Sequence, residues 1–351
     1  MTGELVLITG ANGALGYPTV VHALKAGYRV RAVVRSQAKA ERILNGPSIK
    51  ALDDTTRANL SFAIVDDLLK PDAYDESLKD TTFVIHVASP IPGGGSLLTP
   101  EELEDAFVVP AIKGTINMLE AAERIPFVRR VIITSSVLAQ VSISEIVGPV
   151  SDKVYNETSR TPDPSGPYQH DGVAYMASKI LALNAAERWL KEKERRISIV
   201  HVHPAFTLGR VELATTREEI LQGSSGVTLA YILNLGGPGA TISNTIWVED
   251  VAEMHIRALD EGRIKNGQSL VGSSDGLSGA NWADGKKILQ KRFPRAIETG
   301  AFPIDVWPEP KIMNFDATET ERLLGMKFTG YERQIADVVE QYLEVTGAEV
   351  A

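Results

Sequence analysis

The sequence predicts an α/β fold, a doubly wound parallel sheet with a smaller C-terminal lobe, because short β-branched apolar segments alternate with segments of helical period. The apolar segments are continuous rather than alternating, as in strands that are buried on both faces. After Val202 the pattern changes, and glycine and proline interrupt a stretch of weaker periodicity. The expected strands are Leu5–Thr9, Arg29–Val34, Leu60–Val65, Phe83–Ala88, Val131–Ser135 and Ile197–Val202.

We expect one compact unit made of two discontinuous parts. Residues 1–203 and about 240–265 would form a nucleotide-binding domain, and residues about 204–239 and 266–351 would form a substrate-binding lobe. Between Asp316 and about Glu344, Leu323-Leu324-Gly325 and a longer amphipathic pattern predict two C-terminal helices. No internal repeat or low-complexity tract is present.

The composition narrows the class of protein. With 351 residues, 44% of them hydrophobic, the chain can bury a sizeable core. A net charge of -9 disfavours nucleic acid and anionic lipid as partners, and the lack of cysteine excludes disulfides and thiolate chemistry. The apolar run Leu5–Ile8 follows Met1–Glu4 directly, which leaves no room for a signal peptide, and no span of about 20 apolar residues occurs. We therefore expect a cytoplasmic protein, monomeric or homodimeric, with no membrane partner.

A glycine-rich turn, Thr9 to Gly16, lies between the first expected strand and a helical pattern that starts at Tyr17. Glycines there clear the approach to backbone N–H groups at a helix N-terminus, where a dinucleotide pyrophosphate binds. A tight turn with glycines chosen only for their dihedral angles is the alternative, but the strand–turn–helix order favours a nucleotide. The residues expected to contact it are Gly10, Asn12, Gly13, Leu15 and Gly16.

The end of the second strand favours NADPH over NADH. A carboxylate at this place would bind a ribose 2′-hydroxyl, whereas the chain has Arg35 and Lys39 and no acid before Glu41. These two cations can hold a 2′-phosphate, unless both are merely solvated surface charges. From their places at strand ends, we expect Asp67 and Leu68 beside the adenine, and Val87, Ala88 and Ser89 near the nicotinamide ribose.

Tyr175 and Lys179 stand four residues apart in a strong helical pattern, so they share one helix face. A neighbouring ammonium and a cationic nicotinamide stabilise phenolate and lower the pKa of the phenol toward neutrality. Tyr175 can then act as a proton donor, and Lys179 can also hold the nicotinamide ribose. A tyrosine and a lysine at this spacing are frequent by chance, and the glycine turn is what adds weight to the pair.

Two serines end the fifth expected strand, at the sheet edge where ligands of such folds bind. Strand alternation sends Ser135 and Ser136 in opposite directions, and we favour Ser136 as the hydroxyl that donates to the substrate oxygen. The alternative is a serine that only satisfies backbone groups.

Taken together, these features resemble the extended short-chain dehydrogenase/reductase family. Within it, Arg35–Lys39, His86–Pro90, Pro204–Gly209, Val248–Ala252 and Leu323–Gly325 look like the branch of dihydroflavonol, cinnamoyl-CoA and fungal or yeast carbonyl reductases. The resemblance implies a Rossmann-type fold, catalysis by Ser136, Tyr175 and Lys179, a 2′-phosphate on Arg35 and Lys39, and Pro204 beside the nicotinamide.

Two departures bear on the substrate. Dihydroflavonol reductases place a polar substrate-reading residue five positions after the catalytic serine, where this chain has Val141. Sugar-nucleotide dehydratases place an acid next to their serine or threonine, whereas Val137 and Leu138 follow Ser136. A flavonoid substrate and a dehydration are both disfavoured. The candidates for an apolar substrate pocket are Ile91, Val141, Tyr168 and Phe206, and Ile91, Tyr168 and Phe206 could equally be core.

No metal site is expected, because the alternating His201 and His203 lack a carboxylate or cysteine that would complete a ligand set. The predicted function is NADPH-dependent reduction of a ketone or aldehyde to an alcohol. A hydroxysteroid-type alcohol dehydrogenase and a sugar-nucleotide epimerase are the enzymatic alternatives. An NADPH-sensing binding protein is the alternative of another class, although such sensors typically lose the tyrosine and lysine that are present here.

Overall fold

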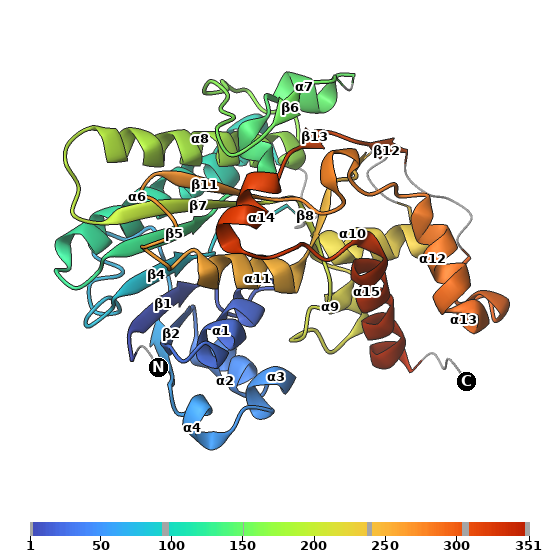
Figure 1. The fold of residues 1–351 in the computed structure, drawn as a ribbon, viewed down its shortest axis with the longest axis horizontal. Coiled ribbons are helices and arrows are strands. Elements are labelled where there is room, and N and C mark those ends of the chain that lie inside the picture. The colour runs from blue at the N-terminus through green and yellow to red at the C-terminus, as the bar shows by residue number, and fades with distance from the viewer. Residues whose placement is uncertain (1–2, 93–97, 150, 237–240, 304–308, 348–351) are drawn as a thin grey trace.

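The computed structural model describes residues 3–92, 98–149, 151–236, 241–303 and 309–347. Its centre is a parallel sheet of seven strands in the order β3-β2-β1-β4-β5-β7-β11, flanked by helices (Figure 1). The predicted doubly wound α/β fold is therefore confirmed. The strands are β1 (Leu5–Thr9), β2 (Arg29–Val34), β3 (Leu60–Ile64), β4 (Phe83–His86), β5 (Arg130–Thr134), β7 (Ser198–Pro204) and β11 (Gln268–Gly272).

The helices of the sheet domain are α1 (Gly16–Lys25), α2 (Gln37–Leu44), α3 (Pro47–Lys50), α4 (Asp54–Arg57), α5 (Pro100–Leu103), α6 (Val109–Arg124), α7 (Ile143–Val147), α8 (Asp171–Lys191), α11 (Val248–Arg257) and α14 (Thr318–Leu324). A π-helical turn, Glu104–Val108, precedes α6, and a 3₁₀ turn, Val137–Gln140, follows β5. The lobe holds α9 (Arg217–Ile220), α10 (Gly223–Ile232), α12 (Asp284–Arg292), α13 (Pro294–Glu298) and α15 (Tyr331–Thr346). Short parallel pairs join β8 (Phe206–Leu208) to β10 (Thr245–Trp247), β9 (Thr241–Ile242) to β12 (Pro310–Lys311), and β6 (Val154–Tyr155) to β13 (Asn314–Phe315).

The central strands β1, β4, β5 and β7 bury both of their faces, whereas the edge strand β3 is half-buried or exposed along its length. In β1, Val6 and Ile8 belong to the core that includes Val20 of α1, while Leu7 belongs to the core that includes Trp189 of α8. Successive side chains of a strand point to opposite faces, so a strand that is covered on both sides must be apolar at every position. This is why the continuous hydrophobic runs predicted a parallel sheet correctly.

The predicted domain boundaries need a correction. The sequence pattern predicts that Gln268–Gly272 belongs to the lobe, but the segment forms β11 and pairs with β7 in the large sheet. Thr320 of α14 accepts a hydrogen bond from the backbone N–H of Val271 at 2.8 Å, and Leu324 lies in the core of the sheet domain. The chain returns to the sheet twice after the lobe has begun, which local periodicity cannot reveal.

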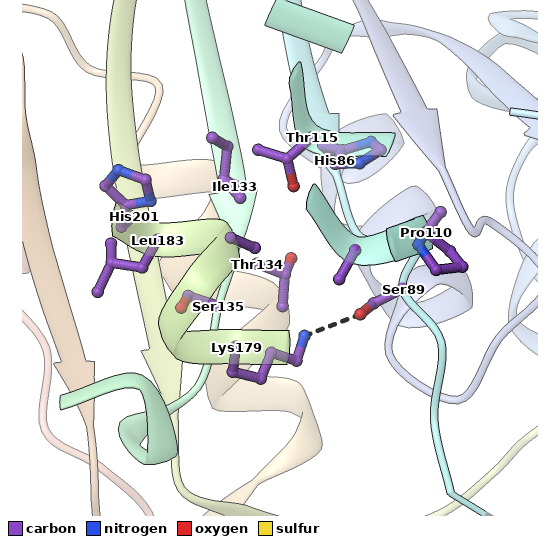
Figure 2. Close-up of a pocket in the computed structure, with 13 residues that line it drawn as sticks. His86, Ser89, Pro110, Thr115, Ile133, Thr134, Ser135, Lys179, Leu183 and His201 are labelled. Carbon is purple, nitrogen blue, oxygen red and sulfur yellow. Dashed lines mark hydrogen bonds between the residues drawn. The ribbon is translucent and has the colours of Figure 1, made fainter. Parts of the chain in front are cut away.

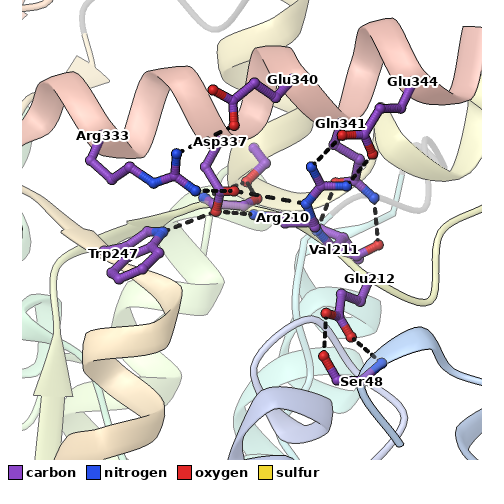
Figure 3. A network of polar contacts seen from close by, with 12 residues as sticks. Ser48, Arg210, Val211, Glu212, Trp247, Arg333, Asp337, Glu340, Gln341 and Glu344 are labelled. Atoms are coloured by element: carbon purple, nitrogen blue, oxygen red, sulfur yellow. Dashed lines mark hydrogen bonds and ion pairs between the residues drawn. The ribbon is translucent and has the colours of Figure 1, made fainter. Parts of the chain in front are cut away.

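The lobe is organised around Trp282, which is fully buried and meets Phe206 and Tyr331 edge-on, with ring centroids 5.8 and 5.9 Å apart. A polar network fastens α15 to the strand ends (Figure 3). In it, one carboxylate oxygen of Asp337 accepts hydrogen bonds from the Trp247 indole at 2.9 Å and from the Arg210 backbone N–H at 3.1 Å. The lobe thus has a core of its own and a polar attachment to the sheet domain.

A second set of contacts joins the lobe to the two helices after β2. Ser48 donates its hydroxyl proton to Glu212 at 2.6 Å, and Arg42 donates to the backbone oxygen of Leu213 and to Glu219. These contacts place the loop after β8 against the end of the sheet that carries Arg35. Among the described residues, no helix is both long and apolar enough to cross a membrane.

His22 of α1 joins α1 to α11 through two carboxylates. Its ring nitrogens lie 2.8 Å from Glu249 and 3.0 Å from Glu253, an arrangement in which both nitrogens must donate. Burial opposes protonation, but the hydrogen bonds to Glu249 and Glu253 outweigh it and raise the pKa of His22. Arg257, which also pairs with Glu253 at 2.6 Å, is the other cation of this cluster.

We predict that His22→Gln lowers the melting temperature more at about pH 6 than at about pH 9. A raised folded-state pKa contributes stability that is complete below the unfolded value of about 6.5 and is lost as the pH rises through the folded value. The loss near pH 6 should be about 1–2 kcal/mol. Thermal unfolding of both proteins across this range measures the difference, and a pH-independent loss would contradict the double ion pair.

Candidate active site

The glycine turn after β1 forms a cradle that a larger side chain would fill. Gly10 has a φ of +66°, and a Cβ at this position would lie 2.9 Å from the backbone nitrogen of Ala88. A Cβ at Gly16 would overlap the carbonyl oxygen of Gly10, so the close packing of α1 against the turn requires glycine. Gly13 is exposed, and Asn12 and Leu15 are half-buried. The accessible amides at the start of α1 fit a dinucleotide pyrophosphate.

Arg35 and Lys39 lie just beyond β2, at the same edge of the sheet as the glycine turn. Both side chains are exposed, and within the described part of the chain neither makes a hydrogen bond or an ion pair. Arg31, by contrast, is committed to the backbone oxygens of Ser77 and Lys79, each at 2.7 Å. Arg35 and Lys39 are therefore the cations of this region that are available to a ligand.

Thr9 connects the end of β1 to the end of β4. Its hydroxyl accepts a hydrogen bond from the backbone N–H of Ala88 at 3.1 Å and lies 2.9 Å from Nδ1 of His86. Burial, with the nearby charge of Lys179, lowers the pKa of His86 to about 4, so the ring is neutral. The Thr9 hydroxyl can then donate a hydrogen bond to His86. The two hydrogen bonds of Thr9 hold the loop of Val87, Ala88 and Ser89 in its position. Sequence reasoning missed this contact, since nothing local to Thr9 points to a histidine 77 positions away.

The predicted helix of Tyr175 and Lys179 is α8. His170 caps it by accepting the N–H of Val173, so the helix begins before the tyrosine, and Tyr175 and Lys179 lie on its second and third turns. Lys179 is buried, and its Nζ lies 5.4 Å from the centroid of the Tyr175 ring. Figure 2 shows the lysine reaching across the strand ends to Ser89, to whose hydroxyl it donates at 3.0 Å. The structure thus brings together Tyr175, Lys179 and Ser89 at the edge that carries the glycine turn.

Burial controls the ionisation of the tyrosine and the lysine. It raises the pKa of Tyr175 to about 12 and lowers the pKa of Lys179 to about 8. The expected lowering of the tyrosine pKa by its neighbour is therefore not found in the protein by itself. At neutral pH the phenol holds its proton and the lysine is mostly charged, which is the combination that a proton donor and its supporting cation require.

A small cavity of about 30 Å³ is lined in part by Lys179 and lies between β5, β7, α6 and α8. Ser89, Pro110, Ser135 and His201 are among the residues around it (Figure 2). The volume suits one or two water molecules.

Ser135 and Ser136 are both buried and occupy different places. Ser135 borders the cavity, whereas Ser136 begins the 3₁₀ turn, where its Oγ accepts the N–H of Leu138 at 3.2 Å. That turn packs against α8, so the end of β5 lies beside the helix of Tyr175. The role of Ser136 stays a prediction.

The remaining predicted cofactor contacts lie at the carboxyl edge of the sheet. Asp67 and Leu68 are half-buried after β3, and the Asp67 carboxylate accepts the N–H of Leu69 at 2.9 Å. Pro204 is buried at the end of β7. These positions suit the predicted contacts, which stay predictions.

The four substrate-pocket candidates do not form one surface. Val141 is fully buried in the core of the sheet domain, so the prediction that it lines a pocket is wrong, because a side chain with no accessible surface cannot border an open site. Tyr168 is 4% exposed and packs with Phe107 of the π-helical turn. Ile91 is 69% exposed, and Phe206 is half-buried against the lobe. Among the described residues no cluster of three metal-ligating side chains occurs.

Comparison with known proteins identifies the class. Residues 6–271 match the NAD dependent epimerase/dehydratase family, and the chain belongs to this family. It is therefore an oxidoreductase that depends on a nicotinamide dinucleotide, and the resemblance to extended short-chain dehydrogenases/reductases is confirmed.

Several of the individual relatives are reductases. The chain is 37% identical over 352 residues to Ketoreductase CTB6 of Cercospora nicotianae, covering 98% of this chain and 96% of the relative. It is 31% identical to Ketoreductase sphI of Aspergillus fumigatus, with 98% and 99% covered. Among solved structures, yeast methylglyoxal/isovaleraldehyde reductase Gre2 complexed with NADPH is similar, with a TM-score of 0.83, 25% identity, and 99% and 100% of the two chains covered.

We predict that the rate of carbonyl reduction falls as the pH rises through about 8, because Lys179 then loses its proton while Tyr175 keeps its own. Initial rates of NADPH oxidation at constant ionic strength measure the profile. Lys179→Arg, whose guanidinium stays charged, should be slower but should lose this descending limb. A limb that persists in the arginine variant would assign it to another group.

Proposed function

We propose that the protein is an NADPH-dependent carbonyl reductase that converts a ketone or aldehyde to an alcohol. The observation that carries the proposal is the placement of Lys179, which donates to Ser89 and lies 5.4 Å from the centroid of the Tyr175 ring, at the sheet edge that holds the glycine turn. When bound, the dinucleotide supplies a hydride. The ketoreductase and carbonyl reductase relatives support the same reaction.

Tyr175 supplies the proton. As hydride reaches the carbonyl carbon, negative charge develops on the oxygen, and a nearby phenol proton neutralises it. Burial keeps this proton on the tyrosine up to high pH, so the acid form is present throughout the neutral range. The charge of Lys179 favours the phenolate that remains, and its contact with Ser89 fixes where that charge lies.

Ser136 would donate its hydroxyl proton to the same oxygen. Its Oγ accepts from Leu138, which leaves its own proton free for an acceptor. The 3₁₀ turn that follows it rests on α8 and holds the serine beside the tyrosine helix. The next residue, Val137, is buried and apolar, so an acid for dehydration is lacking at this place.

Arg35 and Lys39 support NADPH as the cofactor. Both are exposed and unengaged at the tip of β2, where a 2′-phosphate would need charge-assisted partners. The substrate would lie between the sheet edge and the lobe, near Phe206 and Ile91. The NADPH complex of Gre2 agrees with this preference.

Replacing Tyr175 by phenylalanine should lower kcat by about 10²–10⁴-fold, since the proton donor is removed while the ring remains. A panel of aryl ketones, ketoesters and aldehydes, followed by the loss of NADPH absorbance, measures the effect. Tyr28→Phe is the matched control, because Tyr28 packs edge-on against Phe83 near the opposite edge of the sheet. Turnover retained in Tyr175→Phe would reject the proposed acid.

Arg35→Ala should weaken NADPH binding by about 10-fold and leave NADH binding unchanged, because only NADPH carries the 2′-phosphate. Arg29→Ala, at the other end of β2, is the control. Titration of the dinucleotides by fluorescence gives both dissociation constants. Equal losses for the two dinucleotides, or no loss in Arg35→Ala and Lys39→Ala alike, would contradict the phosphate clamp.

A further inference from the structure

His203 lies on β7 next to Pro204 and is completely buried, yet both of its ring nitrogens have partners. Nδ1 lies 3.1 Å from the backbone oxygen of Ser136, and Nε2 lies 3.0 Å from the hydroxyl of Ser269 on β11. The histidine therefore spans from the last strand of the sheet to the residue that begins the 3₁₀ turn. The proposed reaction assigns no role to this side chain.

The partners of His203 decide where its protons are. Burial, together with the neighbouring His201 ring and the nearby charges of Arg160 and Lys179, holds the pKa of His203 well below its usual value, so the ring is neutral. A carbonyl oxygen can only accept, so Nδ1 must carry the proton and donate to Ser136. Nε2 must then accept the hydroxyl proton of Ser269. One tautomer alone satisfies both contacts.

The chain of donors continues to α8. The hydroxyl of Ser269 accepts from the Arg160 guanidinium at 3.0 Å, and Arg160 pairs with Glu187 at 2.6 Å. Glu187 belongs to α8, the helix that carries Tyr175 and Lys179. The hydrogen bonds run in one direction, from the charged Arg160 to Ser269, from Ser269 to His203, and from His203 to the Ser136 carbonyl. The orientations of the Ser269 hydroxyl and of the His203 ring are therefore both fixed.

We propose that His203 is a positioning residue that holds the peptide of Ser136, and with it the serine hydroxyl, at a set place relative to the helix of Tyr175. The carbonyl of Ser136 has two donors, Nδ1 of His203 and the backbone N–H of Ala139 at 3.0 Å. The second belongs to the 3₁₀ turn, which moves with the serine, whereas His203 is anchored in the sheet. The inference rests on the proposed role of Ser136 as the hydroxyl beside the substrate oxygen.

His203→Asn and His203→Gln separate positioning from packing. The amide nitrogen of asparagine lies about as far along the side chain as Nδ1, so this variant can still donate to Ser136, whereas glutamine reaches to about the place of Nε2. We expect glutamine to lower kcat by about 10- to 100-fold and asparagine by less than about 3-fold. The dissociation constant of NADPH should be unchanged in both, and both melting temperatures should be measured. Equal losses of kcat in the two variants would overturn the inference.

Ser269→Ala tests the same chain without changing the histidine. It removes the donor to Nε2 and leaves this buried nitrogen unpaired, so the ring is held by one hydrogen bond instead of two, and kcat should fall several-fold. Ser198→Ala is the matched control. This serine also accepts from an arginine, Arg130 at 2.9 Å, but it lies at the end of β7 opposite to His203. A loss of kcat in Ser198→Ala equal to that in Ser269→Ala would show a general stability effect and would count against the chain.

A double-mutant cycle identifies the residue through which His203 acts. In a Ser136→Ala background, His203→Gln should cost no further kcat, since the positioned hydroxyl is already gone. Additive losses would overturn the inference while leaving the carbonyl reductase proposal intact. Failure of that proposal has a separate signature, which is turnover retained in Tyr175→Phe.

Discussion

The hydrogen bond from Lys179 to Ser89 is the contact on which the site depends. It joins α8 to the loop after β4, and Thr9 and Ala88 tie that loop to the end of β1 and the glycine turn. The dinucleotide cradle and the helix of the proposed proton donor are thereby held in one frame. Lys179 and Ser89 are 90 positions apart in the sequence. They meet because the fold brings α8 to the edge of the sheet at which the parallel strands end.

Burial sets the protonation states of the groups around this contact. The same desolvation that raises the pKa of Tyr175 lowers the pKa of Lys179, so one buried environment keeps the proton on the phenol and weakens the binding of the proton on the lysine. The buried histidines His86 and His203 are kept neutral in a comparable way, which lets each accept or donate in a single fixed direction. These two neutral histidines fix the directions of hydrogen bonds near the charged Lys179, and they add no further charge to the site.

The polar attachments of the lobe complete the arrangement. Asp337 secures α15 to the backbone of Arg210 and to Trp247, and Glu212 reaches Ser48 in the sheet domain. The lobe therefore meets the end of the sheet near Arg35, so the part of the chain that would choose a substrate is joined to the part that would hold the cofactor phosphate. Polar contacts of this kind are typical between two parts of a chain, here the sheet domain and the lobe, that each have a hydrophobic core of their own.

Local patterns in the sequence were sufficient for six of the seven strands of the large sheet, the glycine turn and the helix of Tyr175 and Lys179, because each depends on neighbours within one element. Burial of β1 on both faces requires apolar residues throughout, and four-residue spacing on α8 requires a shared face. The return of Gln268–Gly272 to the sheet, the burial of Val141 and the partners of His203 depend on contacts between segments far apart in the chain. Only the tertiary structure decided these, since no local periodicity records which distant residue will fill a given face or accept a given proton.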